Sequence, residues 1–512
     1  MSEKKEPQVQ PPQEVTSLPI DSIIETRKGK LEVLRSQNID PYPARCEVKD
    51  TVTELRQKYV NLKPGESLEQ DSVILAGRLI TIREMGKSTF AHLQDSTGRI
   101  QIYLRTQAIG AELFANFKKL YDSGDIIGIT GVPFVTRTGE LTIDVRKFGM
   151  LSKALRPLPE KWHGLKDPEL RYRQRYLDLL TNETTAKILR DRALVIKRIR
   201  GLLDGKGFME VETPMMQPIP GGATARPFVT HHNALDIDLY LRIAPELYLK
   251  RLIVGGYDKV YELNRNFRNE GISTKHNPEF TMLELYQAYS DLYGMMDITE
   301  EIICVTAQGY ANENNELEFC GNKINITRPW KRETYFGLLQ AATGEDVYAY
   351  VMDGKTKELA RNLSLDIDVN KTPEHKIIDN IFEKKVQPGL INPTFVTDFA
   401  TKWTPLAKSK PDNPNLVERF ELFVGGEEVA NAYSELNDPI EQRNRLLAQA
   451  KDKAEGDAEA MFFDDDFIIA LEHGMPPCGG LGIGIDRLIM ILTNTSSIRE
   501  TIAFPLMRPE KK

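Results

Sequence analysis

The sequence of 512 residues predicts an α+β protein with a small β-barrel near its N-terminus and a larger domain built on an antiparallel sheet flanked by helices. Three observations support this prediction. The length suits about three domains. Five short runs rich in Val, Ile and Phe follow one another between residues 72 and 153. The rest of the chain mixes strand-like and helical patterns without a βαβ repeat.

The composition narrows the class of protein further. Charged residues make up 28% and hydrophobic residues 41%, which excludes a disordered chain, a collagen and a coiled-coil rod. No stretch approaches the ~18 consecutive apolar residues of a membrane helix, and the N-terminus lacks the apolar core of a signal peptide. The four cysteines show no CxxC spacing. We therefore expect no zinc site, no disulfide framework and no membrane partner, and a cytoplasmic location.

Shifts in composition divide the chain into five predicted segments. Residues 1–20 are rich in Pro and Gln and are expected to form a disordered tail. The other predicted segments are an N-terminal helical segment at 21–65, the barrel at 66–155, a linker at 156–182, and the large domain at 183–512 with a helical insertion near 315–400.

The barrel segment has the organisation of an oligonucleotide-binding (OB) fold. A helical run from Ala108 to Leu120 falls where a five-stranded OB barrel has its helix. Between Ser72 and Lys153, 11 Lys and Arg face seven Asp and Glu, so this segment carries +4 and the rest carries −11 of the total −7. A basic barrel can follow a phosphate backbone. A solvated basic face is the alternative interpretation.

Two phosphate-binding motifs are incomplete. The segment MGKS at 85–88 ends like a P-loop, but Thr81 occupies the position of the earlier glycine. The glycine-rich run at 480–485 lacks the third glycine of a dinucleotide fingerprint. If the chain binds ATP, it must hold the nucleotide in another way.

Three segments of the large domain are more specific together than any one alone. The first, GFMEVETPMM, leads a long basic helix into a strand. The second, FRNEGISTKHNPEF, is expected to place Arg268 and Glu270 on a strand and Phe280 on the return strand. The third, GLGIGIDRLIM, is a glycine-rich strand running into a helix with Asp486 and Arg487 at the junction.

In order and type these segments resemble motifs 1, 2 and 3 of class II aminoacyl-tRNA synthetases. With APELYLK, NPEFTMLELYQAY, GGEEVANAYSELNDP and the preceding barrel, they are similar to the bacterial type of class II lysyl-tRNA synthetase over roughly residues 20–510. The resemblance implies a homodimer that uses ATP as a substrate, with up to three Mg²⁺ ions, to convert L-lysine to lysyl-adenylate. Transfer to the 3′ end of tRNA(Lys) would follow.

The chemistry explains why arginines are needed. A carboxylate must approach the α-phosphate of ATP, so positive charge has to be placed in advance. Arg268 is expected at the α-phosphate and the substrate carboxylate, because guanidinium donates two parallel hydrogen bonds. The resemblance implies Arg487 at the γ-phosphate and one face of the adenine, Phe280 at the other face, and Glu270 at the adenine amino group. The implied ATP-binding residues are Arg268, Glu270, His276, Asn277, Phe280, Glu421 and Arg487, with Arg268 and Arg487 catalytic.

Glu421 and Glu428 are the candidate metal ligands. They lie seven residues apart in FELFVGGEEV, so a helix or a short turn can bring them to one site. Mg²⁺ keeps several waters and needs few protein ligands. The resemblance implies these two as the magnesium carboxylates. Glu427 is an alternative to Glu428, which the register against ANAY favours, and a solvated acidic face is the alternative for the pair.

The charge of the candidate substrate pocket favours a cationic amino acid. A pocket for aspartate needs a cation aimed at the side-chain carboxylate, whereas the positions here are mainly acidic or neutral. The resemblance implies Glu246 and Gly222 at the α-ammonium, and Glu435 and Tyr286 at the ε-ammonium. An unpaired buried carboxylate is costly, so a neutral competitor is rejected. The implied lysine-binding residues are Gly222, Glu246, Arg268, Glu284, Tyr286, Asn431, Tyr433 and Glu435.

In the barrel, Phe90, Gln101 and Glu140 match family positions that read the anticodon, with Arg78 nearby. An aromatic ring stacks on an unpaired base, while amide and carboxylate groups read the base edge. For Phe90, a place in the core is the alternative.

Three rival functions remain. An aspartyl- or asparaginyl-type synthetase has the same two-domain plan. A lysyl transferase that modifies a protein lacks the barrel that this chain retains. A non-catalytic tRNA-binding protein on the same fold predicts loss of Arg268, Arg487, Glu421 or Glu428, and all four are present.

Overall fold

The computed structural model describes residues 19–159, 165, 167–455 and 459–510, and the chain divides into two compact units, 1–164 and 165–512. The predicted tail at 1–20 lies outside the described residues except for its last two, and helix α1 already begins at Ile20. The border between the units falls inside the predicted linker at 156–182.

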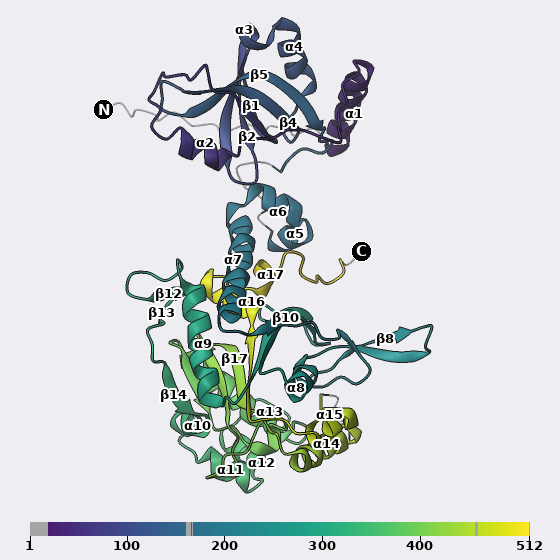
Figure 1. Ribbon diagram of the computed structural model, residues 1–512, viewed down its shortest axis with the longest axis vertical. Coiled ribbons are helices and arrows are strands. Elements are labelled where there is room, and N and C mark those ends of the chain that lie inside the picture. The colour runs from purple at the N-terminus through teal and green to yellow at the C-terminus, as the bar shows by residue number, and fades with distance from the viewer. Residues whose placement is uncertain (1–18, 160–164, 166, 456–458, 511–512) are drawn as a thin grey trace, which may run out of the picture. The chain divides into compact units, whose positions relative to one another are not determined.

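Unit 1 is the expected five-stranded OB fold. Its strands pair in the closed order β1-β2-β3-β5-β4, with β4 returning to β1, and α3 and α4 lie between β3 and β4 along the chain (Figure 1). Its elements are α1 (Ile20–Ser36), α2 (Val52–Lys58), β1 (Val73–Met85), β2 (Ser88–Gln94), β3 (Arg99–Arg105), α3 (Thr106–Ile109), α4 (Ala111–Leu120), β4 (Ile126–Val135) and β5 (Leu141–Ser152).

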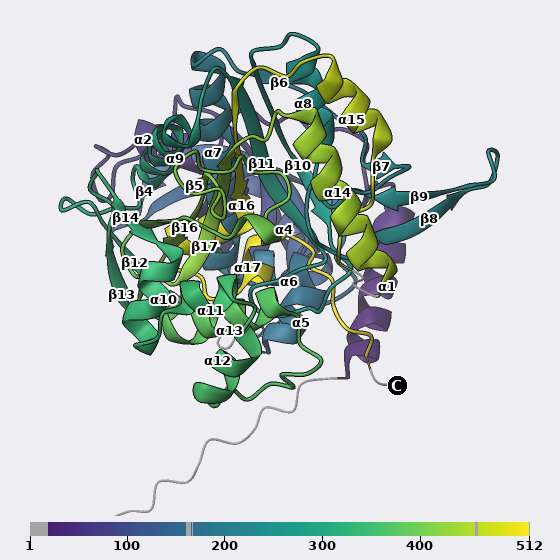
Figure 2. The ribbon, with the colours of Figure 1, turned by 90° about the horizontal axis from the view of Figure 1, so that it is seen from below.

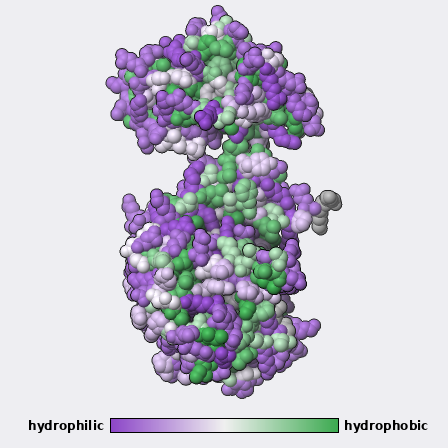
Figure 3. Space-filling model, turned by 45° about the vertical axis from the view of Figure 1, so that its right-hand side comes forward, coloured by the Kyte–Doolittle hydropathy of each residue, from purple (hydrophilic) through white to green (hydrophobic). Residues whose placement is uncertain are grey.

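Alternation of side chains builds the interior of this barrel. Along β2 every second residue is buried, because successive side chains of a strand point to opposite faces. The inward positions, Leu75, Leu93, Ile100, Ile102 and Val145 among them, form one apolar core with α4. The outward positions are mostly polar, and hydrophilic side chains make up most of the surface of this unit in Figure 3.

Unit 2 is built on an eight-stranded sheet in the order β14-β15-β16-β17-β18-β11-β10-β6. The central pairs are antiparallel, whereas the outer pairs β14–β15 and β10–β6 are parallel. The strands of unit 2 are β6 (Met209–Glu210), β7 (Met216–Gln217), β8 (Phe228–His232), β9 (Ile237–Leu241), β10 (Lys259–Phe267), β11 (Glu279–Ala288), β12 (Glu316–Phe319), β13 (Asn322–Asn325), β14 (Lys331–Thr334), β15 (Thr394–Thr397), β16 (Arg419–Val424), β17 (Glu427–Ser434) and β18 (Cys478–Gly484).

Helices cover this sheet, as predicted for an α+β domain. Figure 2 shows α14 and α15 side by side near α8. The α-helices of unit 2 are α5 (Pro168–Arg173), α6 (Arg175–Thr181), α7 (Glu183–Gly205), α8 (Glu246–Val254), α9 (Leu292–Ala307), α10 (Tyr335–Thr343), α11 (Val347–Met352), α12 (Thr356–Asn362), α13 (Glu374–Lys385), α14 (Pro439–Ala454), α15 (Asp465–Glu472), α16 (Ile485–Leu492) and α17 (Ile498–Thr501). In the described part of the chain, none is both long and apolar enough to cross a membrane.

The two faces of the sheet have different tasks. Leu283 and Leu285 of β11, with Leu481 and Ile483 of β18, join the main core with residues of α7, α9 and α16. Because side chains alternate along a strand, the residues between them face the opposite side. That opposite face carries the candidate site.

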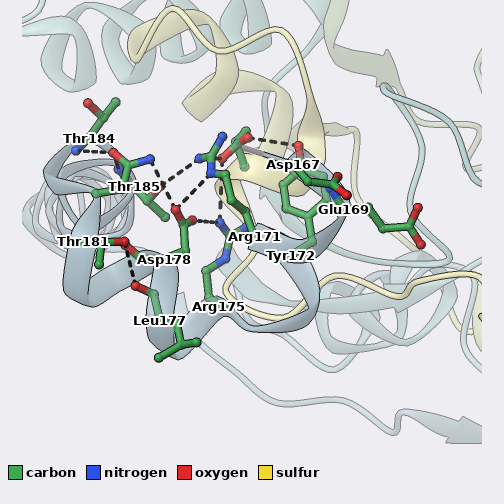
Figure 4. Close-up of polar contacts among 12 residues, drawn as sticks. Asp167, Glu169, Arg171, Tyr172, Arg175, Leu177, Asp178, Thr181, Thr184 and Thr185 are labelled. Atoms are coloured by element: carbon green, nitrogen blue, oxygen red, sulfur yellow. Dashed lines mark hydrogen bonds and ion pairs between the residues drawn. The ribbon is translucent and has the colours of Figure 1, made fainter. Parts of the chain in front are cut away.

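The predicted linker is partly folded into unit 2. Residues 168–181 form α5 and α6, where Arg175 is fully buried and donates to Asp178 Oδ2 at 2.7 Å (Figure 4). Arg171 donates to the other oxygen of Asp178 at 2.9 Å, and Arg175 also donates to the backbone oxygen of Ala503 at 3.0 Å. Composition did not reveal these helices because each is only six or seven residues long.

The segment at 315–400 is less uniform than a helical insertion. Helices α10 to α13 have their own core with Leu339, Ile377 and Ile381. The ends of the segment are strands instead: β12 and β13 form a hairpin, and β14 and β15 extend the main sheet. These strands have four residues each, which is too short for alternation to show in the sequence.

Candidate active site

A cavity of about 340 Å³ lies on the face of the sheet opposite α7 and α9. Its floor is β18, where Gly480, Gly482 and Gly484 place no side chains in the cavity. The flanking strands supply side chains in register: Glu284 and Asn431 lie on either side of Gly482. Tyr286 and Tyr433 lie in the same way on either side of Gly480. The cavity therefore has polar walls and an open floor.

One buried carboxylate connects helix α7, strand β11 and helix α16. Asp486, in the first turn of α16, accepts from the backbone N–H of Thr281 at 2.7 Å and from Arg192 of α7 at 2.5 Å. Arg192 also donates to the Thr281 hydroxyl at 2.9 Å. Since Phe280 and Arg487 are the chain neighbours of Thr281 and Asp486, this junction fixes the backbone of both.

Arg268 and Glu270 lie just beyond the end of β10, so the expectation that they lie on a strand is wrong. The strand ends at Phe267, and Glu270 is exposed in the loop that follows. Arg268 keeps its place because its backbone N–H donates to Pro278 O across the loop at 2.9 Å. Its guanidinium carbon lies 5.1 Å from the centre of the Phe280 ring. Its Nε is buried without a hydrogen-bond partner. This N–H is therefore available to donate to a ligand.

Arg487 and His276 meet at the same end of the cavity. Arg487 donates to the backbone oxygen of Glu428 at 2.7 Å and to its carboxylate at 3.1 Å, and lies 3.3 Å from Nε2 of His276. Asn277 is buried and donates to Glu279 O at 2.6 Å, while its Oδ1 has no partner. The predicted ATP-binding residues other than Glu421 thus line one cavity.

The two candidate metal ligands lie on the adjacent strands of a hairpin, where Glu421 is opposite Asn431 and Glu428 is opposite Phe423. β16 and β17 are joined at Gly425 and Gly426, so a turn rather than a helix brings Glu421 and Glu428 together. Glu421 does not line the cavity; its side chain is 17% exposed and pairs with Arg419. Burial raises the pKa of Glu421 to about 8; Arg419 opposes this increase and the charge of Glu428 adds to it.

The neighbouring glutamates are distinguished by their partners. Glu427 forms an ion pair with Lys275 at 2.5 Å and is not among the residues that line the cavity. Glu428 does line it, with 39% of its side chain exposed. Among the described residues no group of three or more metal-binding side chains occurs. Two carboxylates, of which Glu428 lines the cavity, still fit Mg²⁺, which takes its remaining ligands from phosphates and water.

The other end of the cavity holds the predicted amino-acid pocket. Gly222 has φ +85°, and a Cβ there would lie 2.8 Å from that of Glu246, so only glycine fits. Glu246, Glu284 and Glu435 are buried. Burial raises the pKa of each, with Glu284 reaching about 8. Glu435 lies beneath Gly480, where its Oε1 would be 2.0 Å from a Cβ.

Three residues of this pocket were not predicted. Lys250 bridges Glu246 and Glu435; its spacing of four from Glu246 on an apolar helix was a usable signal. Arg419 donates to Asn431 Oδ1 at 3.3 Å and lies two residues from Glu421 on the same strand face. The alternating glycines of β18, which include Gly480, were a usable signal in the sequence.

A second cavity, of about 330 Å³, lies on the barrel and contains three of the four predicted anticodon residues. Phe90 stacks on Tyr103 with ring centres 4.5 Å apart. Its side chain is partly exposed, so it is not a core residue. Gln101 donates to Glu140 at 2.9 Å. Arg78 does not line this cavity; it donates to Gly124 O at 2.7 Å, and burial lowers its pKa. Sequence reasoning missed the lining residues Arg83, His92 and Arg137.

Family models match both units of the chain. Residues 167–508 match the family described as tRNA synthetases class II (D, K and N). Residues 73–151 match the OB-fold nucleic acid binding domain. The chain therefore belongs to the class II tRNA synthetases of this group, and it is an enzyme with a nucleic-acid-binding OB domain.

Curated relatives extend the likeness over nearly the full chain. A lysine–tRNA ligase of Carboxydothermus hydrogenoformans is 53% identical over 96% of this chain and 99% of its own. A lysine–tRNA ligase of Pelotomaculum thermopropionicum is 52% identical over 96% of each chain. One of Thermotoga maritima is 48% identical over 95% of this chain and 96% of its own.

The raised pKa of Glu284 predicts a pH-dependent cost in stability. Because the pKa in the folded state, about 8, exceeds the unfolded value, stability is lost as the pH rises through 8. We expect Glu284→Gln to be more stable than the parent by ~4 kcal/mol at pH 8.5 and little different at pH 5. Urea unfolding of unit 2 at the two pH values measures this difference.

The matched control is Glu279→Gln, on the same strand but 53% exposed. It should change stability equally little at both pH values. A Glu284→Gln variant that gains no stability at the higher pH would contradict the assignment of a buried, unpaired carboxyl group.

Proposed function

We propose that this chain is a lysine–tRNA ligase that forms lysyl-adenylate from lysine and ATP. The observation that carries the proposal is the charge of the amino-acid pocket. Three carboxyl groups, those of Glu246, Glu284 and Glu435, are buried, and the buried ammonium of Lys250 pairs with two of them, Glu246 and Glu435. A further cation is needed to balance them, because an unpaired buried charge is costly.

The same pocket disfavours the aspartyl-type alternative. A substrate with a side-chain carboxylate needs an unpaired cation at the far end of the pocket. Arg419 pairs there with Glu421, and Lys250 is already shared by two carboxylates. A second carboxylate would add to the negative charge, so a pocket of this charge selects an ammonium.

At the other end the site suits two negatively charged reactants. We place Arg268 at the α-phosphate and the substrate carboxylate, since its unpartnered Nε and its position over Phe280 leave it free to donate. Arg487, His276 and Asn277 would contact the remaining phosphates. Fixed positive charge of this kind lowers the barrier by stabilising the charge that develops on the phosphate oxygens. No covalent nucleophile is required, because positioning and electrostatics suffice.

Glu421 and Glu428 are proposed to hold Mg²⁺, which neutralises phosphate charge when bound. The support is that both carboxylates lie on the same hairpin and that the charge of Glu428 acts to raise the pKa of Glu421. We also propose that the chain acts as a homodimer in the cytoplasm, and sedimentation of the purified protein tests the dimer. The barrel cavity around Phe90 is proposed to bind the anticodon of tRNA(Lys).

ATP–pyrophosphate exchange across the twenty amino acids tests the proposed function. We expect exchange with lysine and none with aspartate or asparagine. Arg268→Ala should lower lysine-dependent exchange by ~100-fold or more, as expected for loss of a group that stabilises transition-state charge.

Arg443→Ala is the matched control for exchange. Arg443 is a surface arginine of α14 that pairs with Asp465 at 3.2 Å, and its removal should leave exchange unchanged. Exchange with aspartate in place of lysine, or full activity of Arg268→Ala, would refute the proposed function.

Phe90→Ala tests the barrel separately. Loss of one stacking platform costs ~1–3 kcal/mol per base, so we expect the KM for tRNA(Lys) to rise ~10- to 100-fold while pyrophosphate exchange stays unchanged. Leu113→Ala, which removes an exposed side chain of α4, should alter neither. If Phe90→Ala aminoacylates tRNA with the parent KM, the anticodon is bound elsewhere.

A further inference from the structure

Lys250 is completely buried. Its partner Glu246 lines the cavity, whereas Lys250 and Glu435 lie behind the lining residues. Lys250 is one turn along α8 from Glu246, and its Nζ lies 2.6 Å from Oε1 of that carboxylate. The same Nζ lies 2.5 Å from Oε2 of Glu435, which follows β17. One ammonium group thus joins a helix to the end of a strand through two carboxylates.

Each ion pair with Lys250 involves one oxygen of the carboxylate and leaves the second oxygen of that carboxylate outside the pair. Oε1 of Glu435 makes no hydrogen bond and lies against Gly480, a residue that lines the cavity floor. Any side chain at position 480 would displace this oxygen, because a Cβ would lie 2.0 Å from it. Lys250 holds the other oxygen of Glu435, and the absence of a side chain at Gly480 leaves room for the free oxygen next to the cavity floor.

We propose that Lys250 is a positioning residue: a resident cation that orients Glu246 and Glu435 and favours their ionised forms, so that the pocket accepts one further ammonium. This inference rests on the proposed function. Two carboxylates and one ammonium leave a single negative charge, which matches the single positive charge of a lysine side chain. The substrate's α-ammonium and α-carboxylate balance each other and need no further counter-charge.

The surroundings make this cation necessary. The groups that face Glu435 besides Lys250 are Glu246, Tyr286, Tyr433 and Cys478. None of them is a cation. Burial acts to raise the pKa of Glu435 and of Glu246, and Lys250 opposes that effect on both. Two further charged groups face Glu246, namely the carboxyl group of Glu284 and the guanidinium of Arg419. The guanidinium of Arg419 is already paired with Glu421.

The test is Lys250→Met, which keeps the length of the side chain and removes its charge. We expect the KM for lysine in pyrophosphate exchange to rise roughly 10- to 100-fold, with kcat and the KM for ATP within about threefold of the parent. Without the cation both carboxylates take up protons more readily. The acidic limb of kcat/KM for lysine should therefore move up by about one pH unit.

Lys259→Met is the matched control, because Lys259 donates to the backbone oxygen of Lys206 at 3.1 Å, away from the pocket. It should leave both KM values and the pH profile unchanged. If Lys250→Met does not fold, Lys250→Gln removes the same charge and keeps a polar group.

Two results would overturn the inference. The first is a charge-neutral variant with the parent KM for lysine and the parent pH profile. The second is an equal rise in the KM values for lysine and ATP, which would mean a general packing defect. Either result leaves the proposed function intact, since that depends on lysine-dependent exchange by the unaltered chain.

Discussion

The buried carboxylate of Asp486 is the interaction on which the geometry of the catalytic unit depends. It accepts from the N–H of Thr281 on β11 and from Arg192 on α7, while it begins helix α16. A buried carboxylate is stable only when its partners satisfy it, so helices α7 and α16 and strand β11 cannot shift independently. Arg487 and Phe280, the neighbours of Asp486 and Thr281, are thereby held at fixed separation around the nucleotide end of the cavity.

Because side chains alternate along β11 and β18, one face of the sheet packs into the core and the opposite face carries the candidate site. Leu283, Leu285 and Ile483 face a continuous apolar core, whereas Glu284 and Gly482 face the cavity. The core supplies the burial that stabilises the unit. The cavity face lowers that stability, because a carboxyl group is held there with a pKa of about 8. On the proposed function, a bound cation offsets the unfavourable burial of these carboxyl groups. The same residues can therefore select a cationic substrate.

Much of this organisation could be predicted from the sequence. The five strands and the helix of the barrel, and the glycine-rich strand before α16, follow from local patterns, whereas the residues of the expected ATP site follow from the resemblance of the motifs. Contacts between distant segments could not be predicted. Lys250 and Glu435 lie 185 positions apart in the printed sequence, and no local pattern links them. Arg78 appeared close to the predicted anticodon residues along the chain, but its guanidinium is held by Gly124 O.

The short helices α5 and α6 escaped prediction for a related reason. Arg175 and Asp178 form a buried ion pair that becomes visible only when the C-terminal segment packs against them. Polar residues that are buried by tertiary contacts look like a linker in the sequence. The same applies to the glutamates of the amino-acid pocket. The composition shows that the chain is acidic, but it does not show that these glutamates are buried.

The central claim is that buried carboxylates select the amino acid by its side-chain charge. Titration calorimetry of the full chain with L-lysine and with L-norleucine, which lacks the ε-ammonium but keeps the α-amino acid and the aliphatic chain, tests it most directly. The account predicts that lysine binds at least ~100-fold more tightly and releases protons near pH 7, because the bound cation ionises carboxyl groups. Norleucine affinity within tenfold of lysine, without proton release for either ligand, would contradict it.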